Sequence, residues 1–154
     1  MKGAPGVCHN QAIPYETDFF LNGNLSELER LAAEVSRFCT AHSLGGEVEF
    51  DLNLVLEELF VNTVRHGGCE GIESSSRVRL RYDSAVEVEF YDRGRPFDPT
   101  LVPPADIDAP LEQREGGLGI HLVRQIMSDV KYRRVDEWNH LSMHRRGRNV
   151  VADN

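Results

Sequence analysis

An acid and an amide stand four residues apart in the segment EELFVN, as Glu58 and Asn62. In a helix, the two side chains would leave the same face about one turn apart. The amide oxygen could then ligate Mg²⁺ while the carboxylate orients or deprotonates a nucleophile. The alternative is that both belong to the solvated face of an amphipathic helix. The apolar character of residues 52–64 weakens that alternative, because it leaves little reason for an amide at Asn62.

A second acid, Asp92, closes a segment of alternating apolar residues and opens the turn DRGRPFDP. A carboxylate at the edge of a core could accept a hydrogen bond from an exocyclic amine such as that of adenine. Gly94 would let a ligand approach the backbone without a Cβ in the way. The prolines, Pro96 among them, would fix the chain around Phe97. Asp, Gly and Pro are also ordinary turn residues, so a plain turn remains the alternative.

A third pattern is the glycine-rich stretch GGLGIHLV, in which Gly116, Gly117 and Gly119 lead into an apolar helical pattern. A helix N-terminus offers free N–H groups and the positive end of its dipole to phosphate. The stretch is not a P-loop, because no GK[ST] follows, and a Rossmann fingerprint would need a parallel βαβ setting. Glycines here could also be only a flexible helix entry. Taken in order, however, the three patterns provide the parts of an ATP–magnesium site.

The elements that must position these groups follow from periodicity and from breaker residues. The expected helices fall within 25–44, 47–68 and 116–130, and the expected strands within 12–21, 77–83, 85–92, 131–138 and 140–146. The last two strands are expected to turn near Asn139, and residues 93–116, with five of the seven prolines, to form a long lid-like loop. This layout predicts an α+β two-layer sandwich, with a mixed sheet covered on one face by about three helices.

Length and composition predict a class of protein and no specific function. The 154 residues suit one domain at 11–147, between a disordered lead-in at 1–10 and a frayed tail at 148–154. The net charge of −8 argues against non-specific binding to nucleic acid. No apolar run approaches the length of about 20 residues that a membrane span needs, and no signal-peptide pattern opens the chain, so we expect a cytoplasmic location. The three cysteines form no CxxC pair, which argues against a disulfide framework or a zinc site.

The three motifs together resemble the GHKL ATPase superfamily, which includes gyrase B, histidine kinases and MutL. EELFVNTVRHG is similar to the N box of that family, DRGRPFDP to its first glycine box, and EGGLGIHLVRQIMSDVKY to its second. The variant DxGxPFDP and the short GGLGI box followed by LVRQIMSDV are typical of the bacterial anti-sigma factor serine/threonine kinases. The resemblance covers roughly residues 15–146 and implies a Bergerat-type ATP-binding fold.

The resemblance implies a role for each matching residue, with ATP and Mg²⁺ as cofactors. Glu58 would be the general base, Asn62 the Mg²⁺ ligand, and Asp92 the residue that recognises the adenine amine, with Gly94 beneath the ring. The other residues implied to bind the nucleotide are His66, Gly67, Pro96, Phe97, Arg114, Gly116, Gly117, Leu118, Gly119 and Ile120. Many relatives carry a threonine in the last hairpin where this chain has Asn139 and His140, which leaves hydroxyl support to adenine open.

The reaction implied by the resemblance is transfer of the ATP γ-phosphoryl group to a serine or threonine of an anti-anti-sigma protein of the STAS type. The implied partners are that protein and a sigma factor, which the kinase sequesters, and the likeness also suggests a homodimer. Two alternatives remain. The chain could be a nucleotide-gated binding module that transfers no phosphate, or the switch kinase of a stress-signalling complex. Glu58 favours a kinase, because a module that only binds needs no base there.

Overall fold

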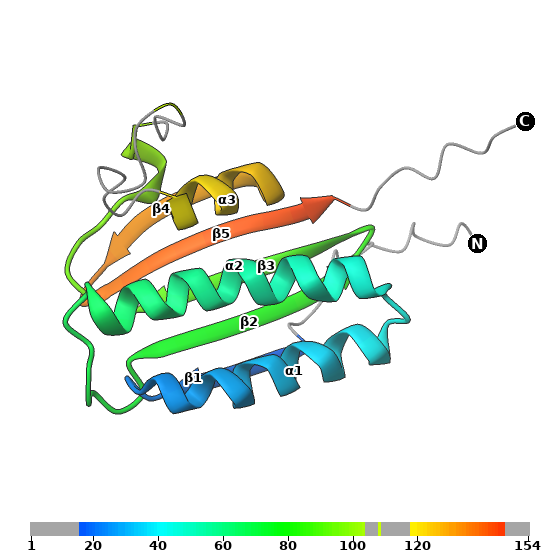
Figure 1. Cartoon of the computed structure of the whole chain (residues 1–154), viewed down its shortest axis with the longest axis horizontal. Helices are drawn as coiled ribbons and strands as arrows, with labels where there is room; N and C mark the ends of the chain where they lie inside the picture. The colour runs from blue at the N-terminus through cyan, green and yellow to red at the C-terminus, as the bar shows by residue number, and fades with distance from the viewer. Residues whose placement is uncertain (1–15, 104–107, 109–117, 147–154) are drawn as a thin grey trace, which may run out of the picture.

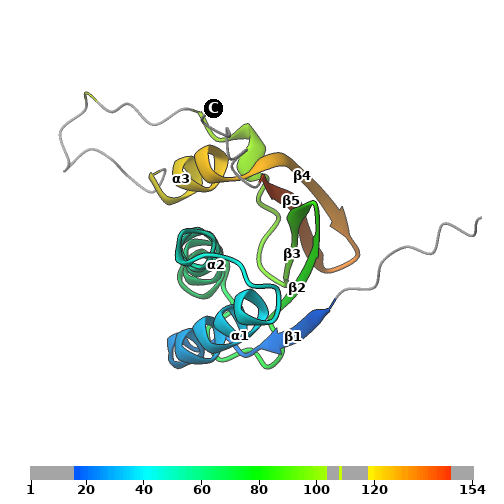
Figure 2. The same ribbon diagram turned by 90° about the vertical axis from the view of Figure 1, so that its right-hand side faces the viewer.

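Within the part of the chain that the structure describes, a five-stranded sheet carries three α-helices on one face (Figures 1 and 2). In this computed structural model the described residues are 16–103, 108 and 118–146. The strands are β1 (Thr17–Leu21), β2 (Ser76–Asp83), β3 (Ala85–Asp92), β4 (Ser128–Val135) and β5 (Trp138–Arg146). The α-helices are α1 (Leu28–Ala41), α2 (Gly46–Arg65) and α3 (Leu118–Ile126), and the short 3₁₀ helices are η1 (Leu25–Glu27) and η2 (Pro99–Leu101).

The strand order is β1-β2-β3-β5-β4, and each described neighbouring pair is antiparallel. The α+β class and the helical cover are therefore confirmed, whereas the expected mixed pairing is corrected to an antiparallel one. The reason lies in the last hairpin, which returns β5 alongside β3 and leaves β4 at the outer edge. The strand β4 runs parallel to β3 but lies one strand away from it. At the end of β3, Asp92 comes to face Asn139 of β5.

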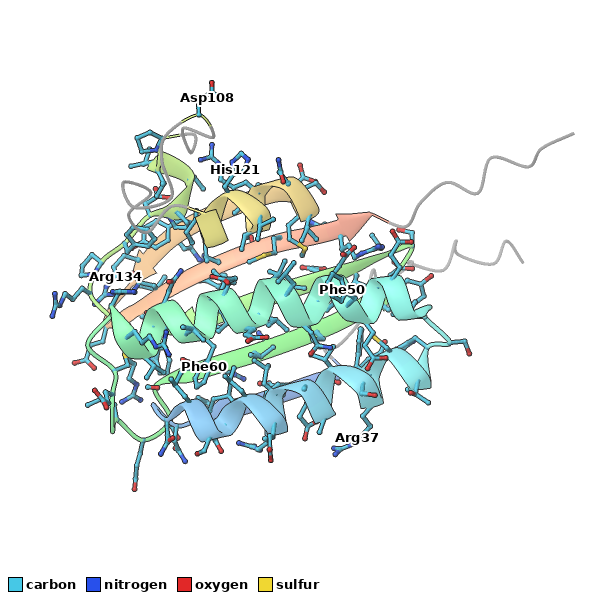
Figure 3. The ribbon with its side chains drawn as sticks, viewed as in Figure 1. Arg37, Phe50, Phe60, Asp108, His121 and Arg134 are labelled. Carbon is cyan, nitrogen blue, oxygen red and sulfur yellow. The ribbon has the colours of Figure 1, made fainter. Side chains whose placement is uncertain are left out.

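The core lies between the helices and one face of the sheet, and it follows the alternation read in the sequence. Strand β3 buries every second residue, at Val86, Val88 and Phe90. Helix α2 turns a continuous apolar face to these strands, and its Phe60 is fully buried (Figure 3). Burial of such side chains stabilises the fold by roughly 1.5–3 kcal/mol each. Helix α2 is thereby fixed over the sheet, and with it the groups on its other face.

Two boundaries differ from those expected from the sequence. The last hairpin turns at Asp136 and Glu137, where Asp136 has a φ of 52°, so Asn139 lies inside β5 and not at the turn. The third helix ends at Ile126 and the chain enters β4 at Ser128, although the helical pattern was expected to continue to residue 130. A positive φ of 53° at Asp129 and a register shift between Ser128 and Lys131 mark this abrupt change from helix to strand.

Several sequence expectations concern residues outside the described ranges. These are the lead-in at 1–10, the tail at 148–154 and most of the predicted lid after residue 103. The first part of the lid is described, and it contains η2, capped by Asp98, whose side chain accepts a hydrogen bond from the Thr100 N–H. Among the described residues, no helix combines the length and the apolar character needed to cross a bilayer.

Candidate functional site

A cavity of about 360 Å³ lies between α2, the C-terminal end of β3, the turn after it and α3. This volume falls within the range of small-molecule sites, roughly 300–1,000 Å³, and such sites combine apolar walls with a few polar groups. The cavity is lined by Leu59, Asn62, Thr63, His66, Gly67, Phe90, Asp92, Arg95, Pro96, Phe97, Pro99, Ile120, Asn139 and Leu141. Its polar groups thus come from three segments that are far apart in the sequence.

The structure brings half of the predicted site residues to this cavity. Those that line it are Asn62, His66, Gly67, Asp92, Pro96, Phe97 and Ile120. Glu58, Gly94 and Gly119 are not among the lining residues, but each contacts a neighbouring site element, as described below. Leu118 is the first residue of α3. Three predicted residues lie outside the described part of the chain, namely Arg114, Gly116 and Gly117.

Asp92 presents one carboxylate oxygen to the protein and keeps the other available. Its Oδ1 accepts hydrogen bonds from the Gly94 N–H at 2.8 Å and from Asn139 Nδ2 at 2.9 Å. Within the described residues, Oδ2 has no hydrogen-bond partner. Burial raises the pKa of Asp92, and the two hydrogen bonds and the positive charge of Arg134 oppose that rise because they favour the ionised form. The carboxylate is therefore set up to accept a hydrogen bond from a donor that enters the cavity.

Asn139 is a cavity residue that the sequence interpretation placed in a turn. It is only 4% exposed. Its Nδ2 group donates to the carbonyl oxygen of Arg95 at 2.9 Å as well as to Asp92, and its Oδ1 accepts from the Tyr132 hydroxyl at 2.6 Å. The signal that could have found it is strand register. With the turn moved to residues 136 and 137, β5 pairs with β3 so that Asn139 faces Asp92.

The turn after β3 packs directly on the C-terminal end of α2. A Cβ on Gly94 would lie 2.7 Å from Asp92 Oδ1, closer than real Cβ contacts, and 3.2 Å from the Gly67 Cα, a tight contact. The Arg95 N–H also donates to the Gly67 carbonyl oxygen at 3.1 Å. Arg134, which extends from β4 at the same end of the sheet, donates to the Gly94 carbonyl at 2.8 Å (Figure 3). Glycine at 94 is therefore required by this close approach of two backbones.

We expect Gly94→Ala to destabilise the protein by about 1–3 kcal/mol, because the added methyl group meets backbone atoms that cannot move aside easily. The measurement is the free energy of unfolding from urea titration. Gly46→Ala is the matched control, since a Cβ at Gly46 meets nothing within 4 Å and the residue lies in a helix. Equal stability of the two variants would contradict the packing of the turn on α2.

The Glu58 side chain contacts the first turn of α3 at Gly119, which has no side chain of its own. A Cβ on Gly119 would lie 2.7 Å from the Glu58 Cδ atom, so the carboxyl end of Glu58 rests against the backbone of α3. Asn62, one turn further along α2, lines the cavity itself. The first turn of a helix carries the positive end of its dipole and free N–H groups. The acid therefore lies against a helix start that suits an anion, and the amide one turn along α2 lines the cavity to which α3 contributes Ile120.

Comparisons with known proteins identify the family of the chain. The histidine kinase-like ATPase domain model matches residues 21–145. The chain is 31% identical over 98 residues to the serine/threonine-protein kinase BtrW of Bordetella bronchiseptica, an alignment that spans 62% of this chain and 69% of that protein. It is 30% identical over 87 residues to the serine-protein kinase RsbW of Oceanobacillus iheyensis, spanning 53% of this chain and 55% of that protein.

A solved structure is similar in fold. The crystal structure of the RsbU and RsbW domains of a Mycobacterium tuberculosis protein superposes with a TM-score of 0.62. The superposition covers 84% of this chain and 32% of that one, at 13% sequence identity. At this identity the likeness concerns the fold alone, and it agrees with the antiparallel sheet covered by helices on one face.

Proposed function

Because the chain belongs to the histidine kinase-like ATPase domain family, we propose that it is an ATP-dependent anti-sigma factor serine/threonine kinase. In this proposal it phosphorylates an anti-anti-sigma protein of the STAS type and sequesters a sigma factor. The family supports ATP binding, and the two relatives that are named protein kinases support phosphoryl transfer to a protein. The observation that carries the proposal is that Glu58 lies against the start of α3 while Asn62, one turn along α2, lines the same cavity as Asp92.

Asp92 would recognise the base at the other end of the cavity. Its Oδ2 atom would accept a hydrogen bond from the exocyclic amine of adenine, while Oδ1 stays bonded to Gly94 and Asn139. The buried side chains of Phe90 and Ile120 line the same cavity and would contact the ring, which is apolar on both faces. Apolar walls with one oriented acceptor are typical of sites that bind a purine base.

Asn62 would hold Mg²⁺ through its side-chain oxygen. The described residues contain no cluster of three or more His, Cys, Asp or Glu side chains that could form an all-protein metal site. A single protein oxygen, that of Asn62, fits Mg²⁺ in a nucleotide site, where one or two protein oxygens bind the metal together with phosphates and water. A bound Mg²⁺ supplies neutralisation of the charge on the phosphates. Asn62 itself would place the phosphates near the first turn of α3.

Glu58 would act on the incoming hydroxyl group. In the proposed transfer the substrate oxygen forms a bond to the γ-phosphorus, the bond from that phosphorus to the β,γ-bridging oxygen breaks, and ADP leaves. The hydroxyl proton passes to the Glu58 carboxylate, which lies against Gly119 at the phosphate end. Most of the rate enhancement in such reactions comes from positioning and charge stabilisation.

Two other functions share the same nucleotide site. A nucleotide-gated binding module would bind ATP and change partners without transferring phosphate, and a switch kinase would phosphorylate a protein without binding a sigma factor. The position of Glu58 beside the start of α3 favours a kinase over the module. Homodimer formation and a cytoplasmic location remain predictions.

The test of the proposed function is transfer of label from γ-labelled ATP. The purified chain is incubated with STAS-domain proteins encoded near its gene, and we expect label on a serine or threonine of one of them. The control is the same STAS protein with that residue replaced by alanine. Binding of ATP without any labelled protein would favour the module. Transfer in the absence of complex formation with any sigma factor, measured by size-exclusion chromatography, would favour the switch kinase.

A further inference from the structure

A chain of hydrogen bonds links the outer strand β4 to the carboxylate in the cavity. The Tyr132 hydroxyl donates to Asn139 Oδ1 at 2.6 Å, and Asn139 Nδ2 donates to Asp92 Oδ1 at 2.9 Å. The three residues come from β4, β5 and β3, which are neighbours in the sheet in that order. Asn139 is buried, and its amide therefore has few alternatives to these partners.

The surroundings fix which end of the Asn139 amide faces Asp92. Its Nδ2 group faces three acceptors, namely Asp92 Oδ1 and the carbonyl oxygens of Arg95 and Gly94, the last at 3.3 Å. A flipped amide would direct its oxygen at all three acceptors and would lose every one of these hydrogen bonds. The Tyr132 hydroxyl donates a hydrogen bond to Oδ1, and a flipped amide would place an N–H group there in place of this acceptor. Asn139 is thus held as a donor toward Asp92.

This orientation fixes the hydrogen-bonding character of Asp92. Two N–H donors, from Gly94 and Asn139, point at Oδ1, so a proton on that oxygen would be repelled by their hydrogens. Donors of this kind favour the ionised form of a carboxylate. Burial raises the pKa of Asp92, and the hydrogen bonds from Asn139 and Gly94 oppose that rise. In the ionised form that they favour, Oδ2 carries no proton and can only accept a hydrogen bond. A ligand group opposite Oδ2 must therefore be a donor.

We propose that Asn139, held by Tyr132, is a positioning residue that keeps Asp92 an acceptor and thereby makes the cavity select a purine with an amino group over one with a carbonyl at the same position. The proposal rests on the proposed function, in which the cavity binds ATP. It assigns the discrimination between ATP and ITP to a residue that need not touch the base. A site built to bond one polar group rejects the analogue that cannot make the bond.

The experiment measures the dissociation constants of ATP and ITP for each variant by calorimetry, and the readout is their ratio. We expect wild type to prefer ATP by at least about tenfold, and Asn139→Ala to lower that preference by about tenfold, the usual effect of losing a hydrogen bond to a charged group. Tyr132→Phe should lower it less and in the same direction. Tyr82→Phe is the matched control. The Tyr82 ring contacts His42, and Tyr82 does not line the cavity.

A double-mutant cycle distinguishes positioning from a general structural role. If Asn139 acts through Asp92, Asn139→Ala should change the ITP to ATP ratio in wild type and leave it unchanged in an Asp92→Asn background. Asn139→Asp should reduce the preference most, because a second carboxylate beside Asp92 favours its protonated form, and a proton on Oδ2 can be donated to a carbonyl.

Three outcomes decide the matter. If Asn139→Ala weakens the binding of ATP and of ITP by equal factors, the positioning role is overturned. If Asn139→Ala does not fold, an unchanged ratio of dissociation constants in Tyr132→Phe overturns it. If the effect of Asn139→Ala persists undiminished beside Asp92→Asn, it does not act through Asp92, and the proposal is likewise overturned. Wild type that binds neither nucleotide would overturn the proposed function itself, and the inference with it.

Discussion

Replacing Glu58 with glutamine is expected to lower phosphoryl transfer by about 100-fold or more and to leave the dissociation constant of ATP within about threefold of wild type. The amide keeps the shape of the carboxylate and its contact with Gly119, but it cannot take the proton of the incoming hydroxyl. Binding should survive because Glu58 is not among the residues that line the cavity. Single-turnover transfer and equilibrium binding, measured on the same preparation, separate the two effects.

The matched control for Glu58 is its neighbour. Glu57 precedes it on α2 and is exposed, so Glu57→Gln makes the same chemical change away from the site. We expect transfer by Glu57→Gln to equal that of wild type. Full transfer by Glu58→Gln would remove the base assignment, and a large loss of ATP binding would mean that Glu58 contacts the nucleotide and not only the hydroxyl.

Replacing Asn62 with alanine should abolish the part of ATP affinity that depends on Mg²⁺. Wild type is expected to bind ATP at least about tenfold more tightly with Mg²⁺ than with a chelator, and Asn62→Ala should bind equally in both conditions. The physical reason is that Asn62 is the only residue on the α2 part of the described cavity lining with a side-chain amide or carboxylate oxygen. The measurement is ATP binding by titration with and without the metal.

Asn53→Ala provides the control for this variant. Asn53 lies on the same helix but does not line the cavity, so its replacement by alanine removes an amide away from the site. It should keep the full effect of Mg²⁺. An Asn62→Ala protein that retains the same gain from Mg²⁺ as wild type would show that the metal is held without this amide, and the assignment of Asn62 would be wrong.

The local part of the site could be predicted from the sequence. The spacing of Glu58 and Asn62 fixes their common helical face, and the alternation before Asp92 fixes its place at the end of a strand. Both depend on periodicities of a few residues, which the chain cannot satisfy in another way without exposing its apolar face. The hairpin joined at Ser84 is predictable for the same reason.

The non-local part could not be predicted in this way. Asparagine is a common turn residue, so the sequence predicts a turn near Asn139, whereas the turn at residues 136 and 137 contains neither glycine nor proline. A shift of the turn changes the register, and the register alone decides that Asn139 faces Asp92. The end of α3 is not predictable from periodicity, because Met127 continues the apolar helical spacing although the chain enters β4 one residue later.

The central place of β3 in the sheet has a consequence for how the two ends of the cavity open. Asp92 lies on a strand that is paired on both sides, opposite Ser76 of β2 and Asn139 of β5. Amide hydrogen exchange around Asp92 should therefore require an opening close to global unfolding in free energy. Helix α3, with nine residues and no strand partner, can detach at lower cost. In thermal fluctuations the α3 side of the cavity would then open many times for each opening around Asp92. In the proposed binding mode, a nucleotide would therefore enter and leave with its phosphates toward α3.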